Sequence, residues 1–227
     1  MCNAAQPKEV VEQNTLQVAV HFPCPVFIID RPDFLAAVQE VSEESLKNSH
    51  AQNQVDDIYP MMMSGTFHND PRVKTFAEYV AATAWNILDD QGYAMQHFNT
   101  FFESMWTQEH HKQSSMEQHV HGGGVQIVGF YFLEVPEGSS RVVFHDPRPG
   151  KVMGDLPQKD MNQATPASQM INFEAKPGRL IFSNAWLPHS FTRHAGETPL
   201  KFVHFNLGVM YANNQAQTCQ APAAEVV

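Results

Sequence analysis

The sequence is short of cysteine and basic residues, and it has no long apolar run. Three cysteines, Cys2, Cys24 and Cys219, are spread over 227 residues, which is too sparse for a disulfide framework or a zinc ribbon. No run of about 18 apolar residues is present, so we expect no membrane-spanning helix. The first residues have neither the charged region nor the apolar core of a secretory signal. These absences predict a cytoplasmic protein without structural disulfides.

Basic residues are outnumbered, with 14 Lys and Arg against 24 Asp and Glu, for a formal net charge of −10. No basic cluster offsets this charge locally, which argues against a nucleic-acid backbone as the main partner. Apolar residues make up 43% of the chain and include 16 Phe. That content is enough for a sizeable core, and the length suits one domain.

Composition divides the chain into a helical first third and a strand-rich remainder. Residues 1–18 and 213–227 are polar or rich in Ala and Gln, and we expect them to be flexible tails around a single domain of residues 19–212. Asp30-Arg31-Pro32 predicts the start of a helix that runs to about residue 47. A second helix is predicted from Asp70-Pro71 to about residue 89, because its apolar positions recur every three or four residues.

The remainder consists of short β-type runs separated by glycine and proline. These runs span residues 98–107, 125–135, 140–145, 169–174, 179–183, 189–193 and 200–209. Short strands without helices between them indicate a sandwich or a double-stranded barrel. The connection 147–168 is long enough to be a lid over a site, and a surface insertion without a role is an equal alternative.

The most informative residues are His119 and His121, which precede an apolar strand. Two residues apart on a strand, their side chains project to the same face, and His189 on a later strand can close on them. Neutral imidazoles bind Fe(II), Zn(II) and Cu(II), so the three predict a metal site. Gly122–Gly124 would leave room above the metal for substrate or oxygen. The alternative is an accidental pair of loop histidines beside a flexible turn.

Other polar residues are weaker candidates. His110 and His111 are adjacent, so their side chains diverge on a strand, and we expect both at the surface. Asp146 is the one carboxylate placed to serve as a third or replacement ligand, although an aspartate before proline is more typical of a turn. Lys201 is an isolated cation in an apolar run. An inward Lys201 would need an anion such as a cosubstrate carboxylate, and one facing water would need none.

Several segments in a fixed order carry a family resemblance. After the two histidines come Phe144–Arg148, then Pro177–Phe182 leading to Leu187–Ser190, then Lys201–Asn206. This succession resembles the putative 2-oxoglutarate- and Fe(II)-dependent oxygenases common in marine bacteria and their viruses. His21–Val26 is similar to the opening strand of that family. The resemblance covers roughly residues 20–210. It implies a mainly β fold with N-terminal helices, a double-stranded β-helix (jelly roll) with iron at its open end.

The resemblance also suggests which residues bind the cofactors. The family triad is usually His-x-Asp/Glu with a distal His. Here His121 stands at the carboxylate position, so the implied metal ligands are His119, His121 and His189, with Asp146 as the alternative to His121. The basic residue that holds 2-oxoglutarate corresponds to Lys201. Tyr131 and Gln126 could hydrogen-bond the cosubstrate, or could be packing residues.

The resemblance implies a dioxygenase that uses Fe(II), 2-oxoglutarate and O2 to hydroxylate an unidentified substrate. A cupin-type metal enzyme without 2-oxoglutarate is one alternative. A non-catalytic barrel that binds a ligand or partner is another. We expect a cytoplasmic location, in the host cell if the source is viral. We expect no nucleic-acid or membrane partner, and a homodimer stays open.

Overall fold

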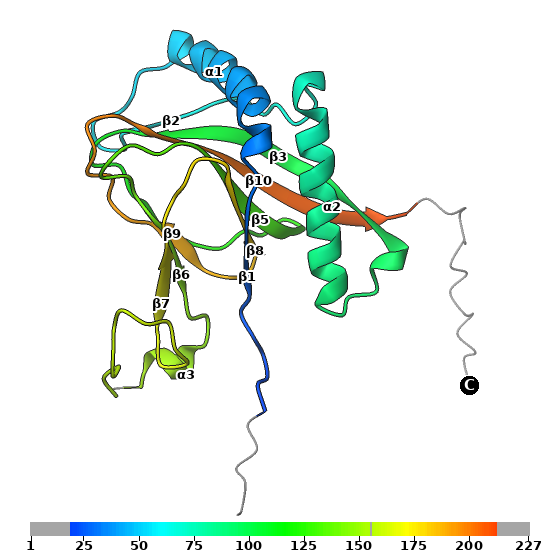
Figure 1. The fold of residues 1–227 in the computed structure, drawn as a ribbon, viewed down its shortest axis with the longest axis vertical. Coiled ribbons are helices and arrows are strands. Elements are labelled where there is room, and N and C mark those ends of the chain that lie inside the picture. Colours follow the sequence, from blue (N-terminus) through cyan, green and yellow to red (C-terminus); the bar gives the residue numbers. More distant parts are fainter. Residues whose placement is uncertain (1–18, 155, 213–227) are drawn as a thin grey trace, which may run out of the picture.

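The computed structural model describes residues 19–154 and 156–212; the tails expected at 1–18 and 213–227 lie outside the described residues. Two antiparallel sheets face each other, and two long helices cover the outer side of the larger sheet (Figure 1). The strands are β1 (Val26–Asp30), β2 (Met61–Met63), β3 (Phe98–His110), β4 (Met116–His119), β5 (Val125–Glu134), β6 (Val142–His145), β7 (Met170–Phe173), β8 (Arg179–Asn184), β9 (His189–Phe191) and β10 (Leu200–Tyr211). The helices are α1 (Leu35–Gln52), α2 (Lys74–Asp90) and the short α3 (Pro149–Val152), with 3-10 turns at Pro32–Phe34, Pro71–Val73 and Met95–His97.

Both predicted long helices form, with a proline at the start of each segment. Pro32 and Pro71 begin the 3-10 turns that lead into α1 and α2, because the fixed φ of proline suits a first helical turn. The Asp70 carboxylate accepts a hydrogen bond from the Arg72 backbone N–H at 2.9 Å and caps the second segment. The buried faces of α1 and α2 then rest on the large sheet.

Strand order confirms the predicted double-stranded β-helix. The large sheet has the order β1-β8-β5-β10-β3-β2, and the small sheet has the order β4-β9-β6-β7. From β3 onward the chain passes repeatedly from one sheet to the other, so strands far apart in sequence become neighbours. The segment 21–26 that resembles the opening strand of the family lies mostly before β1, which begins at Val26.

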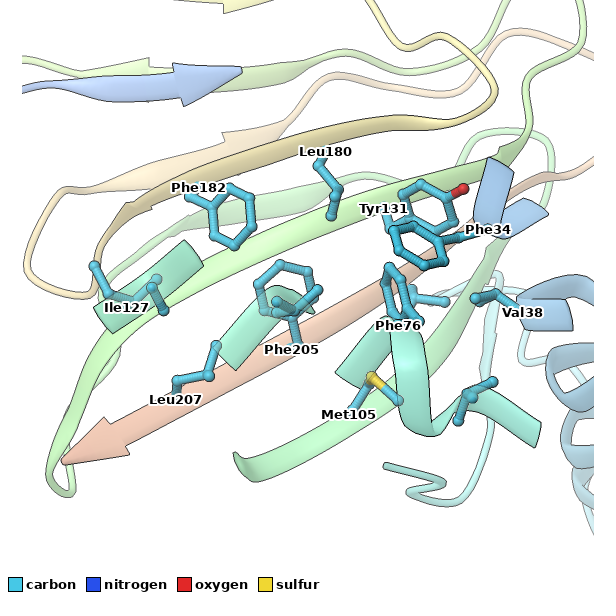
Figure 2. Packing of buried hydrophobic residues seen from close by; sticks show 14 of the residues in the cluster. Phe34, Val38, Phe76, Met105, Ile127, Tyr131, Leu180, Phe182, Phe205 and Leu207 are labelled. Carbon is cyan, nitrogen blue, oxygen red and sulfur yellow. The ribbon is translucent and has the colours of Figure 1, made fainter. Parts of the chain in front are cut away.

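The large sheet is buried on both faces. One face, with Val203 and Phe205 of β10, packs under the helices together with Phe76 of α2 (Figure 2). The other face, with Phe202 of β10 and Phe130 of β5, fills the space between the two sheets. Alternate residues of β10 therefore belong to different cores: one faces the helices and the other lines the barrel interior.

The long connection 147–168 contains α3 and borders a cavity. With the segment 20–26 and the end of β6, Thr165, Pro166 and Ser168 line a cavity of about 250 Å³. Lys151 Nζ donates a hydrogen bond to the Ala167 carbonyl oxygen at 2.9 Å and ties the connection together. A lid function for this segment stays a prediction. Among the described residues, no helix combines the length and apolar character needed to cross a membrane.

Candidate metal centre

Three histidines meet between the sheets. His119 ends β4 and lies directly opposite His189 of β9 in the strand register, with ring centroids 4.5 Å apart. His121 follows two residues later and stacks on His189 at 5.2 Å. The His121 backbone N–H donates to the Ala185 carbonyl oxygen at 3.0 Å, which fixes this segment against the end of β8.

The ring nitrogens are arranged as in a metal site. One ligand atom from each histidine lies within 4.8 Å of the other two. The Nδ1 atoms of His119 and His189 lie 2.8 and 3.1 Å from the carbonyl oxygens of Glu117 and Leu187. These contacts orient the rings and leave Nε2 free, as outer-shell partners of metal ligands do. The Nε2 atoms of His121 and His189 are buried without a hydrogen-bond partner, so the donor set fits a metal ion.

Burial keeps His121 and His189 in the neutral form that binds a metal. Desolvation, with a smaller contribution from neighbouring imidazoles, lowers the pKa of His189 to about 3 and that of His121 to about 4. A protonated imidazole cannot bind a metal, and both of these are neutral at pH 7. The site is thus ready to coordinate without first losing protons from these two rings.

A second set of polar atoms lies beside the triad on the large sheet. His204 of β10 lies 5.2 Å from His121 between ring centroids and 4.4 Å from Trp106 of β3. His204 Nδ1, Trp106 Nε1 and the side-chain oxygen of Asn206 are all buried without hydrogen-bond partners. Orphaned buried polar atoms cost about 1–3 kcal/mol each, so three together indicate a place where a polar ligand belongs. Sequence reasoning missed these residues, because β10 is apolar on both faces and nothing in the β3 sequence distinguishes Trp106 from a packing residue.

Lys201 and Tyr131 are not brought to the triad. Lys201 shares the helix-facing side of β10 with Val203, and its Nζ lies 3.0 Å from Glu134 Oε1. The Tyr131 ring packs 4.9 Å from that of Phe76 under the helices, and its hydroxyl donates to the Arg31 carbonyl oxygen at 2.7 Å (Figure 2). Both side chains lie on the opposite face of the large sheet from His204.

Gln126 and Asp146 have different surroundings. Gln126 is exposed at the start of β5. Its backbone carbonyl oxygen accepts a hydrogen bond from the Ala185 backbone N–H at 2.9 Å, so Gln126 lies near the segment that holds His121. Asp146 is outside the triad. Its carboxylate accepts 2.9 and 2.6 Å hydrogen bonds from the Arg148 guanidinium, and this partner lowers the pKa of the carboxyl. The turn interpretation therefore describes Asp146 better than the ligand interpretation.

The expectation that His110 lies at the surface is wrong. His110 is fully buried, with its ring 5.0 Å from that of Phe202 and its Nε2 3.1 Å from Gln108 Oε1. Strand β3 extends three residues beyond the predicted end at 107, and this carries His110 into the core between the sheets. Burial lowers the pKa of His110 to about 3.

Comparisons with known proteins agree with this geometry. The sequence model of the family described as "Putative 2OG-Fe(II) oxygenase" matches residues 104–206. A search of curated proteins found no match. One similar solved structure is SnoK, a non-heme alpha ketoglutarate dependent carbocyclase from nogalamycin biosynthesis, with a TM-score of 0.60, 9% identity and coverage of 83% of this chain and 82% of that one.

Two further solved structures are similar. A Pseudomonas putida prolyl-4-hydroxylase has a TM-score of 0.55 and 7% identity, covering 82% of this chain and 93% of its own. The epimerase SnoN, in complex with Fe3+, alpha ketoglutarate and nogalamycin RO, has a TM-score of 0.51 and 13% identity, covering 87% and 88%. At such identities the likeness shows a shared fold. The segment that matches the family model, residues 104–206, contains all three histidines.

Proposed function

We propose that this protein is a non-haem Fe(II)- and 2-oxoglutarate-dependent oxygenase whose metal ligands are His119, His121 and His189. The observation that carries the proposal is the convergence of three imidazole ligand atoms within 4.8 Å of one another, inside the segment that matches the family. Iron and 2-oxoglutarate, when bound, activate O2 for oxidation of a substrate. The substrate stays unassigned.

The chain contributes position, shielding and vacant ligand positions. Three protein ligands leave the remaining positions of a six-coordinate ion to small molecules. Phe130 and Phe144 surround His189, with ring centroids 5.6 and 6.0 Å from it. These rings exclude water from the buried side of the site, which strengthens the interactions made there and limits side reactions.

We propose that the carboxylate end of the cosubstrate is received by Trp106 and His204. Their buried polar atoms lack partners, and His204 lies beside the triad. Indole and imidazole N–H groups can both donate to a carboxylate, whereas the Asn206 amide already donates to Ser104 Oγ at 3.2 Å. The usual charged anchor has no equivalent on this face, since Lys201, the one Lys or Arg of β10, points toward the helices and pairs with Glu134.

That missing charge favours one alternative. A barrel with three histidine ligands and no cation on the inner face of β10 also suits a cupin-type metal enzyme that needs no 2-oxoglutarate. The two functions differ in whether the bound metal accepts 2-oxoglutarate as a chelating ligand, so a binding measurement separates them.

The deciding experiment is an anaerobic Fe(II) titration with and without 2-oxoglutarate, followed by the visible charge-transfer band of the chelate. The proposal expects stoichiometric iron and a band that appears only with 2-oxoglutarate. Iron without the band would favour the cupin-type enzyme, and no iron would leave a non-catalytic barrel. His189→Ala should lose the iron, and His97→Ala, which alters an exposed histidine far from the triad in sequence, should keep it.

A further inference from the structure

A second group of potential metal ligands lies on the helix side of the large sheet. His50 in the last turn of α1 places Nε2 3.0 Å from Oε1 of Glu109 on β3. His111, one residue past β3, places its Nε2 2.6 Å from the same oxygen. One ligand atom from each residue lies within 4.8 Å of the other two. The backbone N–H of His111 donates to the Pro60 carbonyl oxygen at 3.0 Å, which holds this end of the strand in place.

This group is separate from the triad. Glu109 shares a face of β3 with Thr107, whose hydroxyl donates to Ser42 Oγ of α1 at 2.7 Å. That face is covered by the helices, whereas the triad lies between the two sheets. A metal bound at one place would therefore share no ligand with the other.

The charges around Glu109 are unbalanced. Its side chain is 8% exposed, so an ionised carboxylate there needs a close partner. The nearest Lys or Arg, Lys201, has its Nζ 4.0 Å from Glu109 Oε2 and only 3.0 Å from Glu134 Oε1. Two carboxylates share this one ammonium group, so a divalent cation bound by the two imidazoles would add favourable positive charge beside Glu109.

The imidazoles are also placed for a metal. His50 is within hydrogen-bond distance of Glu109, whereas His111 Nε2 is buried with no hydrogen-bond partner despite its closeness to the same carboxylate. Two nitrogens and one oxygen thus converge, and only one of the two nitrogens is satisfied. Such an unpaired buried nitrogen is costly, and coordination would remove the cost.

We propose that His50, Glu109 and His111 form a second metal site that binds a borderline divalent cation of the Zn(II) type. Two imidazoles and a carboxylate are a donor set that such ions prefer. With bonds of about 2.0–2.2 Å, tetrahedral ligands lie about 3.3 Å apart, so the ligands need to separate only slightly from their 3.0 and 2.6 Å contacts. His50 and His111 are partly exposed, which leaves room for this movement and for water at the fourth position.

The proposed site would join the end of α1 to β3. His50 and Glu109 are 59 residues apart in sequence, so a metal here links the helical layer to the large sheet. Its role is structural in this arrangement. It requires neither iron nor 2-oxoglutarate at the triad, so its success or failure is independent of the proposed oxygenase function.

The test uses Co(II) as a spectroscopic probe of the full-length protein. In a His119→Ala/His189→Ala variant, which disables the triad, one equivalent of Co(II) should bind and give the visible bands of a tetrahedral ion. Adding Glu109→Gln, which preserves volume, should weaken binding by more than about 100-fold, beyond the loss typical of an outer-shell partner. His97→Ala, which removes an exposed histidine elsewhere, should leave Co(II) binding unchanged.

A second measurement does not depend on the triad variant folding. In the wild-type protein, Zn(II) should raise the melting temperature, and Glu109→Gln or His50→Ala should lower the number of bound Co(II) equivalents by one, whether or not the triad also binds Co(II). Circular dichroism should confirm that these single variants are folded. Equal Co(II) stoichiometry and affinity in wild type and Glu109→Gln would overturn the proposal and leave the cluster as an ion pair.

Discussion

Lys201 Nζ lies 3.0 Å from Glu134 Oε1 across the β10–β5 pair. The two side chains are 22% and 37% exposed, and Glu109 Oε2 lies 4.0 Å from the same ammonium group. The lysine thus compensates two carboxylates under the helices, and it is directed away from the three histidines.

Replacing Lys201 by methionine should reduce stability without weakening cosubstrate binding. Loss of the ammonium leaves Glu109 buried without its nearest cation, and after allowance for partial exposure we expect about 1–2 kcal/mol lower free energy of unfolding. Urea unfolding at pH 7 measures this change. Affinity for 2-oxoglutarate, read from the chelate band of the iron-loaded protein, should stay within about twofold, or about 0.4 kcal/mol, because Lys201 pairs with Glu134 on the other face of the sheet from the triad. A tenfold loss would instead show that Lys201 is the anchor.

Removing a hydrogen-bond donor beside the triad should weaken 2-oxoglutarate binding. Trp106→Phe keeps the aromatic ring and deletes the indole N–H. A hydrogen bond to a charged group contributes about 1.5–3 kcal/mol, so the apparent dissociation constant of 2-oxoglutarate should rise by roughly 10- to 150-fold. His204→Phe, which deletes the imidazole of the other proposed donor, should act in the same direction. Iron content, measured by a colorimetric chelator, should not change in either variant, and unchanged 2-oxoglutarate affinity in both would exclude this anchor.

Acid should destabilise the metal-free protein through its buried histidines. Burial lowers the pKa of His110 and His189 to about 3 and that of His121 to about 4, compared with an unfolded value of about 6.5. Between these limits the unfolded chain binds more protons, so the stability present above pH 6.5 is lost as the pH falls toward 3.

The expected slope is up to about 1.4 kcal/mol per pH unit for each proton taken up. Chemical unfolding of the metal-free protein at about pH 7.5, 6.0 and 5.0, which covers the upper part of this window, measures the slope. His110→Gln should lower the number of protons taken up on unfolding by close to one, and the slope should fall accordingly. His97→Gln, at an exposed site, should leave the slope unchanged. Equal slopes in all three proteins would contradict the assignment of His110 to the acid-sensitive group.

Gly129 should tolerate no side chain. A Cβ there would overlap the Phe205 ring and lie 2.6 Å from the Ile181 carbonyl oxygen. Gly129 lies on β5, between β8 and β10, so neither neighbour can withdraw easily. Gly129→Ala should lower the free energy of unfolding by about 1–3 kcal/mol or more. Gly122→Ala is the matched control, because its Cβ would meet no atom within 4 Å.

The sequence was sufficient to predict where the histidines meet but not which way Lys201 points. His119 and His121 are two residues apart beside a strand, so they share a face. Their partner His189 stands in the segment Leu187–Ser190, which begins a later strand. Lys201 lies in a strand whose two faces are both apolar, because the large sheet is covered by helices on one side and by the small sheet on the other. Alternation then cannot distinguish the inner face from the outer face.

The same limit explains the other differences. Tyr131 lies on the central strand β5, where every neighbour is apolar, so its contact with the helices could not be read from the pattern. His50 and Glu109 come from a helix and a strand with no local signal that joins them. Their proximity depends on how α1 crosses the sheet, which is a property of tertiary packing.

The position of β4 has a consequence for how the centre acquires its metal. This four-residue strand is the edge of the small sheet, it pairs only with β9, and its register is interrupted between Met116 and His119. Short edge strands open at low free-energy cost, so in the metal-free protein His119 should separate from His189 while the large sheet stays closed. Amide hydrogen exchange would show this as rapid exchange in β4 that slows on metal addition. Local fraying of one strand would then be the entry route for the ion, and coordination would close that route behind it.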